Sequence, residues 1–152
     1  MTVANIKFEY LNKIDFSGAA PVIFNILADN MEKIAPTGNT REEDYKFWYE
    51  SVKDGLKRDE RQIVLIKNAD SIIGFFQYFT NENTFMMEEI QFRPDYQGKG
   101  IGTELMNQMI GYLKEKRIYM ISVVFEESLK PFYDKFGFYP MLCGQMETFN
   151  SK

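Results

Sequence analysis

The sequence predicts an α+β fold in which about four helices cover a single mixed, mostly antiparallel twisted sheet of about seven strands. Three strand-like segments in the middle of the chain follow one another through short polar turns, so they must pair as antiparallel hairpins. Beyond them, a glycine-rich loop and an amphipathic helix connect two apolar strands by a crossover, which allows those strands to be parallel neighbours. The elements alternate without a linker over 152 residues, so we expect one domain, residues 1–152.

The first third of the chain predicts one strand and two helices. We expect the strand at residues 5–11 and a helix over residues 16–35, where apolar side chains recur at helical spacing. The run Pro36–Asn39 contains a proline and a glycine, which end this helix. The run Thr40–Glu43 has the form of a capping box, so it opens a second helix that ends near Lys57.

The middle of the chain predicts three strands joined by tight turns. The strands are expected at residues 62–67, 71–79 and 84–92, where aromatic and branched apolar side chains are frequent. Polar turn residues separate them at 68–70 and 81–83. These three strands therefore form the antiparallel part of the sheet.

The last third predicts the crossover and two closing strands. We expect the crossover helix over about residues 100–116, because its apolar side chains share one face, and a strongly apolar strand at 118–125. A short helix follows at 128–136, with a proline in its first turn and a glycine after its end. Two short strands at 138–142 and 145–149 complete the predicted sheet.

The residue composition excludes several classes of active site. The chain contains no histidine, which excludes Ser-His-Asp and Cys-His nucleophile systems and every histidine-ligated metal site. Its single cysteine, Cys143, excludes an internal disulfide and a cysteine-cluster metal site. We therefore expect no metal, and we expect Cys143 to be an unreactive thiol in a reducing compartment.

Charge and hydropathy limit the partners. A net charge of −4 argues against a general nucleic-acid binder. The chain has no run of about 18 apolar residues that would span a bilayer, and its start has no apolar signal-like stretch. These features predict a cytoplasmic protein that acts on neither membranes nor nucleic acids.

The run Gln97–Thr103 (Gln-Gly-Lys-Gly-Ile-Gly-Thr) is the strongest functional signal. It follows an apolar strand and opens an amphipathic helix, and three glycines in five positions leave the backbone accessible. The free N–H groups and the dipole of a helix start favour an anion there. The run therefore predicts a cradle for the phosphate or pyrophosphate of a nucleotide-like cofactor.

Three other interpretations of the glycine run are weaker. A Walker A loop requires Gly-Lys-Ser/Thr at positions that Lys99 and Thr103 do not occupy. A dinucleotide-binding fingerprint requires a third glycine where Thr103 stands, although Glu126 follows the next strand roughly where a ribose-binding acid would lie. A glycine turn that binds no ligand is disfavoured, because three close glycines before a helix are costly unless something approaches the backbone.

Two segments resemble motifs of the GNAT N-acetyltransferase superfamily. Residues 92–102 resemble motif A, whose core is [QR]-x-x-G-x-[GA], with Gln97, Gly100 and Gly102 at its three defined positions. Residues 131–138 (Pro-Phe-Tyr-Asp-Lys-Phe-Gly-Phe) resemble the F-Y-x-K-x-G-F motif of the same family. The two motifs occur in the family's order and spacing, and the predicted β-α-α-β-β-β-α-β-α-β-β order is GNAT-like over nearly the whole chain.

This resemblance implies acetyl-coenzyme A (acetyl-CoA), or another acyl-CoA, as the cofactor. Backbone N–H groups would hold the pyrophosphate at Gly98, Lys99, Gly100, Ile101, Gly102 and Thr103. Gln97 belongs to the same expected site, and Ile90 and Phe92 would pair their backbone with the pantetheine arm. The strand that begins at Ile118 would splay away from them and leave a slot for the thioester. Lys99 either reaches a phosphate oxygen or stays in solvent.

The resemblance also implies direct acyl transfer to a primary amine. A lysine-like amine is protonated at pH 7, which costs roughly 4 kcal/mol before it can attack, so a carboxylate or a water chain ending at one is expected. We favour Glu88 as this base, while Glu89 and a water relay remain alternatives; strand alternation predicts that the two carboxylates face opposite sides. Tyr133 is the expected general acid. Glu126 stands where the family often has asparagine, which leaves its role open.

Two function classes follow from these observations. The first is an N-acetyltransferase whose acceptor is a small-molecule or peptide amine. The second is an acyl-CoA-binding sensor or scaffold with little catalysis, since the base is not unique and Glu126 departs from the family pattern. Many members of the family dimerise, so a homodimer is one expected assembly.

Overall fold

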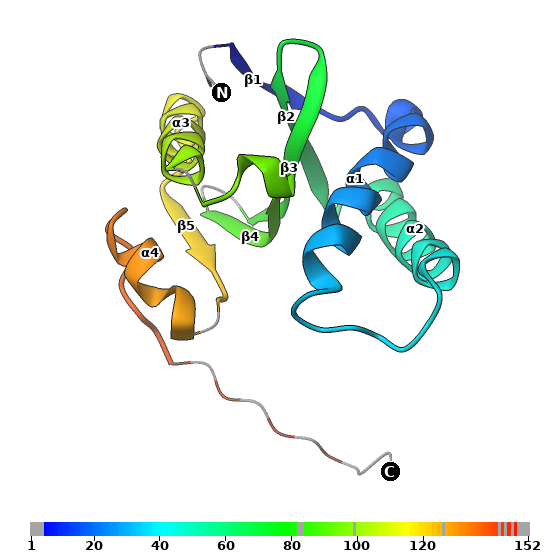
Figure 1. Cartoon of the computed structure of the whole chain (residues 1–152). Coiled ribbons are helices and arrows are strands. Elements are labelled where there is room, and N and C mark those ends of the chain that lie inside the picture. The colour runs from blue at the N-terminus through cyan, green and yellow to red at the C-terminus, as the bar shows by residue number, and fades with distance from the viewer. Residues whose placement is uncertain are drawn as a thin grey trace.

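The computed structural model describes residues 5–81, 84–98, 100–125 and 127–142, together with Gly144, Met146 and Thr148 (Figure 1). Five strands form one sheet in the order β1-β2-β3-β4-β5. The strands are β1 (Ile6–Tyr10), β2 (Gln62–Asn68), β3 (Ser71–Asn81), β4 (Thr84–Phe92) and β5 (Met120–Val123). The helices are α1 (Phe16–Met31), α2 (Arg41–Lys57), α3 (Ile101–Glu115) and α4 (Lys130–Asp134). Short 3-10 turns are η1 (Lys13–Asp15), η2 (Pro94–Tyr96) and η3 (Glu127–Leu129).

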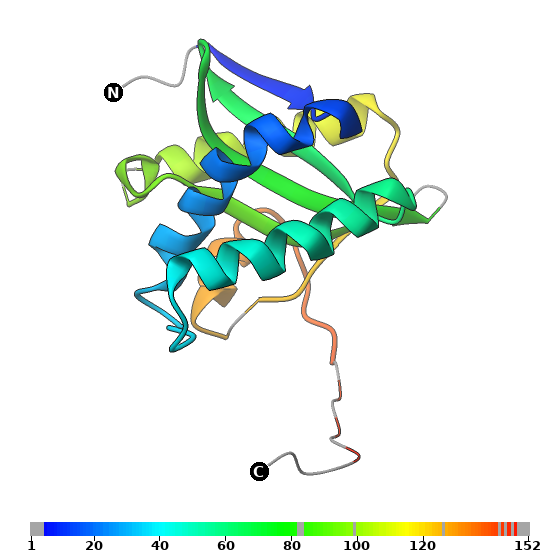
Figure 2. The ribbon, with the colours of Figure 1, turned by 90° about the vertical axis from the view of Figure 1, so that its right-hand side faces the viewer.

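The helices lie on both faces of the sheet. Neighbouring strands from β1 to β4 pair antiparallel, and β4 pairs with β5 in parallel, so the sheet is mixed. Figure 2 shows α1 and α2 crossing the face of the sheet nearest the viewer, while α3 lies behind it. In Figure 1, α4 lies beside β5 on the same side as α3. The result is a three-layer arrangement of helices, sheet and helices.

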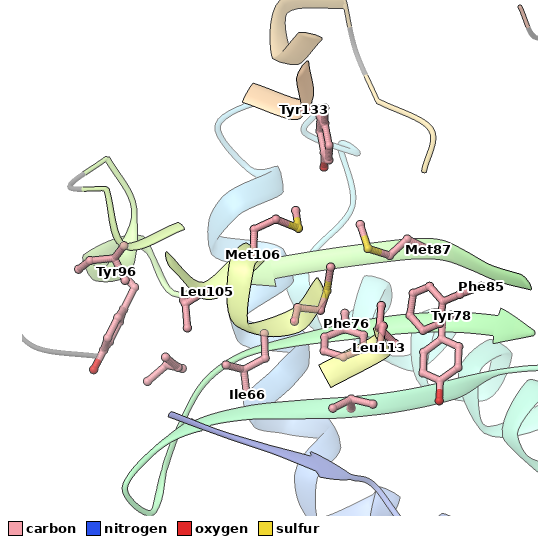
Figure 3. Packing of buried hydrophobic residues seen from close by; sticks show 14 residues of the cluster. Ile66, Phe76, Tyr78, Phe85, Met87, Tyr96, Leu105, Met106, Leu113 and Tyr133 are labelled. Carbon is pink, nitrogen blue, oxygen red and sulfur yellow. The ribbon is translucent and has the colours of Figure 1, made fainter. Parts of the chain in front are cut away.

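Each face of the sheet has its own apolar core. The core under α3 and α4 includes Val64 and Ile66 of β2, and Figure 3 shows its packing around Phe76 and Leu105. The core under α1 and α2 includes Ile63 and Leu65, the alternate residues of the same strand. Because both faces are covered, four consecutive residues of β2 are buried, which explains why the strand is continuously apolar rather than alternating.

The starts of α1, α2 and α3 follow the sequence prediction, but α4 covers only Lys130–Asp134 rather than 128–136, because residues Glu127–Leu129 form the 3-10 turn η3. The capping box is confirmed: Glu43 N donates to Thr40 Oγ1 at 3.2 Å, and Thr40 N donates to Glu43 Oε2 at 3.0 Å. The first helix ends at Met31 rather than near residue 35. Apolar spacing alone extended it to Ile34, but that side chain is exposed and does not pack on the sheet.

The prediction of about seven strands is wrong, because the described part of the chain forms a sheet of five. Residues 138–142 do not pair with β5, and Tyr139, Met141 and Leu142 are exposed there. The expected strand at 145–149 and the turn at 81–83 lie largely outside the described residues. A short apolar run predicts a strand by composition, but a strand also requires a partner edge, and composition does not specify that partner.

The close contact between β3 and β4 gives a stability prediction. A Cβ at Gly74 would lie 2.5 Å from the Gln91 carbonyl oxygen, so Gly74→Ala must push the two strands apart. We expect this substitution to lower the free energy of unfolding by about 1–3 kcal/mol, measured by urea denaturation.

The matched control is Gly111→Ala within α3. Nothing lies within 4 Å of a Cβ added at Gly111, so this variant should gain about 0.5–1 kcal/mol from helix propensity. Equal stability of Gly74→Ala and the wild-type protein would show that the strands are not in tight contact.

Candidate active site

The glycine loop presents an open backbone surface at the start of α3. Gly98 and Gly100 adopt φ angles of 73° and 76°, in the left-handed region that favours glycine. Gly100 is the N-cap of α3 and provides no side-chain cap. Among the described residues other than chain neighbours and the helix's own backbone, nothing lies within 4 Å of a Cβ added at Gly98, Gly100 or Gly102. This geometry fits an anionic group held by backbone N–H groups.

The loop is held at both of its ends. Ile101, the first residue of α3, is buried in the core under α3 and α4, and Tyr96 of η2 is buried in the same core. Thr103 is half-buried in the first turn of the helix. The predicted contact residue Lys99 lies outside the described residues, as do Glu126 and Cys143.

Strand β4 extends beyond its pairing with β5. The parallel pairing runs from Thr84 with Met120 to Met87 with Val123, and no described residue of β5 pairs with residues 88–92, which we call the edge segment. Arg93 N donates to the Ile73 carbonyl at 2.8 Å, so Phe92 and Gly74 form a non-hydrogen-bonded pair.

The backbone groups of the edge segment therefore have a defined direction. In a non-hydrogen-bonded pair the N–H and C=O groups point away from the partner strand, so those of Phe92 point away from β3. Ile90 lies two residues earlier in the same regular ladder, and its backbone groups point the same way. These are the two residues predicted from the sequence to pair with a pantetheine arm.

A β-bulge places both candidate carboxylates on one face of the sheet. Gln77 pairs with Glu89 and Tyr78 pairs with Met87, which leaves Glu88 as an extra residue in β4. Arg61 Nε lies 3.4 Å from Glu88 Oε1, and the Arg61 stem lies against Gly55 of α2. The Glu88 side chain retains 24% exposure.

Glu89 also lies on the side of α1 and α2. Its cross-strand partner Gln77 is two residues from Phe75, which belongs to the core under those helices. Gln91 Nε2 donates to Glu89 Oε1 at 2.6 Å. The expectation that strand alternation separates Glu88 and Glu89 is therefore wrong, because the bulge interrupts the alternation.

The two carboxylates have different surroundings. Burial raises the pKa of the Glu89 carboxyl above its ordinary value, the hydrogen bond from Gln91 lowers it, and the negative charge of Glu88 raises it further. Glu88 instead lies beside the guanidinium of Arg61. Burial is thus the largest influence on the Glu89 carboxyl, and it favours the protonated form.

Tyr133 is held in an aromatic cluster on the other face of the sheet. Its ring stacks on Phe125 with centroids 4.3 Å apart, and Phe132 and Phe138 meet it edge-on. The residue is only 6% exposed, and burial raises the pKa of its hydroxyl, so Tyr133 is protonated at neutral pH. In Figure 3 the hydroxyl points from α4 toward Met106 and Met87.

Two residues that contact the expected site, Asn30 and Gln91, were not found from the sequence. Gln97, an expected cofactor contact, donates its side-chain amide to the Phe92 carbonyl at 2.7 Å and to Asn30 Oδ1 at 2.9 Å. Asn30 of α1 and Gln91 of β4 are part of the same network. No local sequence pattern marks Asn30 or Gln91. The two side chains are 61 residues apart, and Asn30 is 67 residues from Gln97.

Other features of the described residues lie apart from this site. A groove of about 330 Å³ between α1 and α2 contains none of the expected site residues; it is lined by Pro21, Phe24, Asn25, Arg41, Glu42 and Tyr45. In the described ranges, no three acidic or cysteine side chains gather where they could hold a metal ion. None of the described helices has the length and apolar character needed to cross a bilayer.

Sequence comparison identifies one family and two curated relatives. The model of the Acetyltransferase (GNAT) family matches residues 21–138. An uncharacterized N-acetyltransferase, ycf52, from Porphyra purpurea is 35% identical over 92 residues, which are 57% of this chain and 52% of that protein. Its counterpart from Pyropia yezoensis is 34% identical over 91 residues, with the same coverage. The chain thus spans about half the length of the curated relatives it matches.

Solved structures share the fold at low sequence identity. A transcriptional regulator from Bacillus halodurans superposes with a TM-score of 0.68 at 19% identity, covering 95% of this chain and 99% of that one. A PaiA N-acetyltransferase from Thermoplasma acidophilum, in complex with coenzyme A, superposes with a TM-score of 0.62 at 19% identity, covering 91% of both chains. These likenesses show a common fold.

The raised pKa of Glu89 predicts a pH-dependent stability. The folded protein binds the Glu89 proton more tightly than the unfolded chain, so this contribution is fully present below about pH 4.5 and is lost as pH rises through the folded pKa. Glu89→Gln removes the titration. We expect wild-type unfolding free energy to fall relative to Glu89→Gln as pH rises from 4.5 to 8 in urea denaturation series.

Glu50→Gln, on the exposed surface of α2, is the control for the loss of one carboxylate. If the free energies of unfolding of Glu89→Gln and Glu50→Gln changed with pH in the same way over this range, Glu89 would titrate like a solvated side chain.

Proposed function

Because the chain belongs to the Acetyltransferase (GNAT) family, we propose that it moves an acetyl group from acetyl-CoA directly to a primary amine. One observation carries the proposal: the open N-terminus of α3 lies a few residues beyond the edge segment of β4. A helix start binds an anion, and a strand edge binds an extended chain through its backbone. A pyrophosphate joined to an amide-containing arm matches both features in one ligand.

The residues of the loop and the edge segment fit this cofactor. Backbone N–H groups from Gly98 to Thr103 would hold the pyrophosphate, where no side chain of Gly98, Gly100 or Gly102 blocks it. The edge segment would hold the arm through the backbone of Ile90 and the N–H of Phe92. The coenzyme A bound to the Thermoplasma relative supports the same ligand here. When bound, acetyl-CoA supplies the thioester carbonyl that an amine attacks.

Tyr133 is assigned to donate a proton to the departing sulfur. A phenol that burial keeps protonated is a suitable acid, because a thiolate leaves more readily when it receives a proton. The aromatic contacts with Phe125 and Phe138 fix the ring, so its hydroxyl keeps one direction. This rigidity favours proton transfer from a single position.

Glu88 is assigned to take the proton from the amine, directly or through water. The bulge turns its carboxylate to the α1–α2 face at the first residue of the edge segment. Glu89 is the alternative base, supported by the raised pKa of its carboxyl, since a base works best when its pKa approaches the working pH. The two are neighbours on the same face, so either one places the acceptor amine on that side.

A second candidate function is an acyl-CoA sensor or scaffold. The ion pair between Arg61 and Glu88 supports it, because it engages the carboxylate that the enzyme needs as a base. The acceptor in the enzymatic reading is a small-molecule or peptide amine. The single cysteine in 152 residues fits a reducing cytoplasm, and a homodimer is the assembly proposed from the family.

The cofactor proposal predicts a selective effect of Gly102→Val. The new side chain would extend over the N–H groups of the α3 start, where nothing else lies within 4 Å, so it should obstruct the anion without disturbing the core. We expect the Kd for acetyl-CoA, measured by isothermal titration calorimetry, to rise at least about 10-fold.

Gly18→Val is the matched control, because Gly18 also lies in the first turn of a helix with open space around it. Its Kd should equal that of the wild-type protein. Absence of acetyl-CoA binding by wild-type protein at high micromolar concentration would falsify the cofactor assignment.

The acid assignment predicts that Tyr133→Phe slows turnover without weakening cofactor binding. Loss of a general acid should lower kcat about 10²-fold, while the Kd for acetyl-CoA stays within about twofold. Release of the free thiol is measured with a panel of polyamines, aminoglycoside-like amines and short peptides. Tyr139→Phe, at an exposed tyrosine six residues later, is the control.

Wild-type kcat in Tyr133→Phe would remove this residue from the chemistry. Sustained thiol release that requires an acceptor would exclude the sensor alternative, and acetyl-CoA binding without release for any amine would favour it.

A further inference from the structure

Three side-chain amides join parts of the chain that are far apart in sequence. Asn30 lies in the last turn of α1, Gln91 in β4 and Gln97 in the glycine loop; we call them the amide chain. Gln97 Nε2 donates to Asn30 Oδ1 at 2.9 Å, and Asn30 Nδ2 donates to Gln91 Oε1 at 2.8 Å. Gln91 Nε2 then donates to Glu89 Oε1 at 2.6 Å. The amide chain thus runs from the loop to a carboxylate.

The Phe92 carbonyl fixes the direction of these hydrogen bonds. A carbonyl oxygen can only accept, and it lies 2.9 Å from Asn30 Nδ2 and 2.7 Å from Gln97 Nε2. Both amides must therefore turn their NH₂ groups toward it. The Asn30 oxygen is then left to accept from Gln97, and every later link donates toward Glu89. Bonds aligned in this way polarise one another, which strengthens the last bond to the carboxylate.

The amide chain also limits what the edge segment can bind. Two side-chain amides occupy the acceptor capacity of the Phe92 carbonyl, which points away from β3. At this position the edge segment keeps only its N–H donor for a ligand. The same contacts hold Gln97, one residue before Gly98, against the end of β4. A side chain from α1 therefore contacts the residue that precedes the first glycine of the loop.

We propose that Asn30 is a positioning residue that fixes the glycine loop against β4 and orients the Glu89 carboxylate. It couples the cofactor side of the site to the acid–base side without touching the reacting atoms. The proposal rests on the proposed function for its catalytic meaning, whereas its structural part concerns the cofactor-free protein alone. A packing role for Asn30 would change global stability without a specific effect on the loop.

The test compares Asn30→Ala with Asn25→Ala, the same change at an exposed position of the same helix. In the cofactor-free protein, amide hydrogen exchange is followed by NMR at Tyr96, Gln97 and Glu104, which flank the glycine loop and donate to the carbonyls of Arg93, Pro94 and Gly100. We expect Asn30→Ala to accelerate exchange there about 3- to 10-fold, as the loss of one or two hydrogen bonds implies, with β2 unchanged. Asn25→Ala should leave the loop at wild-type rates.

A double-mutant cycle with Gln97→Ala adds a readout that a packing role would not move. We expect Asn30→Ala to weaken acetyl-CoA binding about 5- to 10-fold, and Gln97→Ala to add less than about twofold in that background, because both break the same link. If Asn30→Ala does not fold, the same hydrogen-exchange measurement is made on Gln97→Ala, which changes an exposed loop residue and breaks the same hydrogen bond.

The outcomes separate this proposal from the proposed function. Wild-type exchange in the loop of Asn30→Ala, or additive effects in the cycle, would overturn the positioning role even if acetyl-CoA binds. If the wild-type protein does not bind acetyl-CoA, the proposed function fails. The double-mutant cycle is then calculated from the hydrogen-exchange rates of the loop instead of from Kd values. Selective acceleration with non-additivity supports Asn30 as the residue that holds the loop.

Discussion

The short parallel pairing between β4 and β5 is the constraint on which the site depends. It covers four residue pairs and stops at Met87 and Val123, while β4 continues to Phe92. Backbone groups of a strand edge need partners, since an unpaired buried N–H or C=O is costly. Side-chain amides satisfy the Phe92 carbonyl, and a ligand that pairs like a strand would satisfy the rest. η2 and the glycine loop connect this strand edge to the open N-terminus of α3, where we propose that the anionic part of the same ligand binds.

The sheet also separates the groups that we propose as proton donor and proton acceptor. Tyr133 packs in the core under α3 and α4, whereas the β4 bulge turns Glu88 and Glu89 toward α1 and α2. In an acyl transfer the amine approaches one side of the carbonyl and the thiol leaves from another. An acid and a base on opposite faces of one strand match that requirement. The bulge keeps both carboxylates on one face, whereas a regular strand would have sent one of them to the face that holds Tyr133.

Local sequence signals predicted the parts of the fold that depend on neighbouring residues. The capping box at Thr40 and the glycines at Gly98 and Gly100 are encoded within a few positions, and the structure has them where they were expected. The buried run of β2 follows from its continuous apolar sequence. The apolar segment at 138–142 shows the limit of such signals, since it resembles a strand but has no partner in the sheet.

By itself, the sequence determined the chemistry that is available: no histidine, one cysteine, two adjacent glutamates before a glycine loop, and a tyrosine in an aromatic motif. Only the tertiary structure decided where these groups lie relative to one another. The register of β3 against β4 placed the bulge at Glu88, and the packing of α1 brought Asn30 to Phe92 and Gln97. Helix caps and turns are local, whereas strand register and side-chain networks depend on contacts across more than 60 residues, which no short pattern specifies.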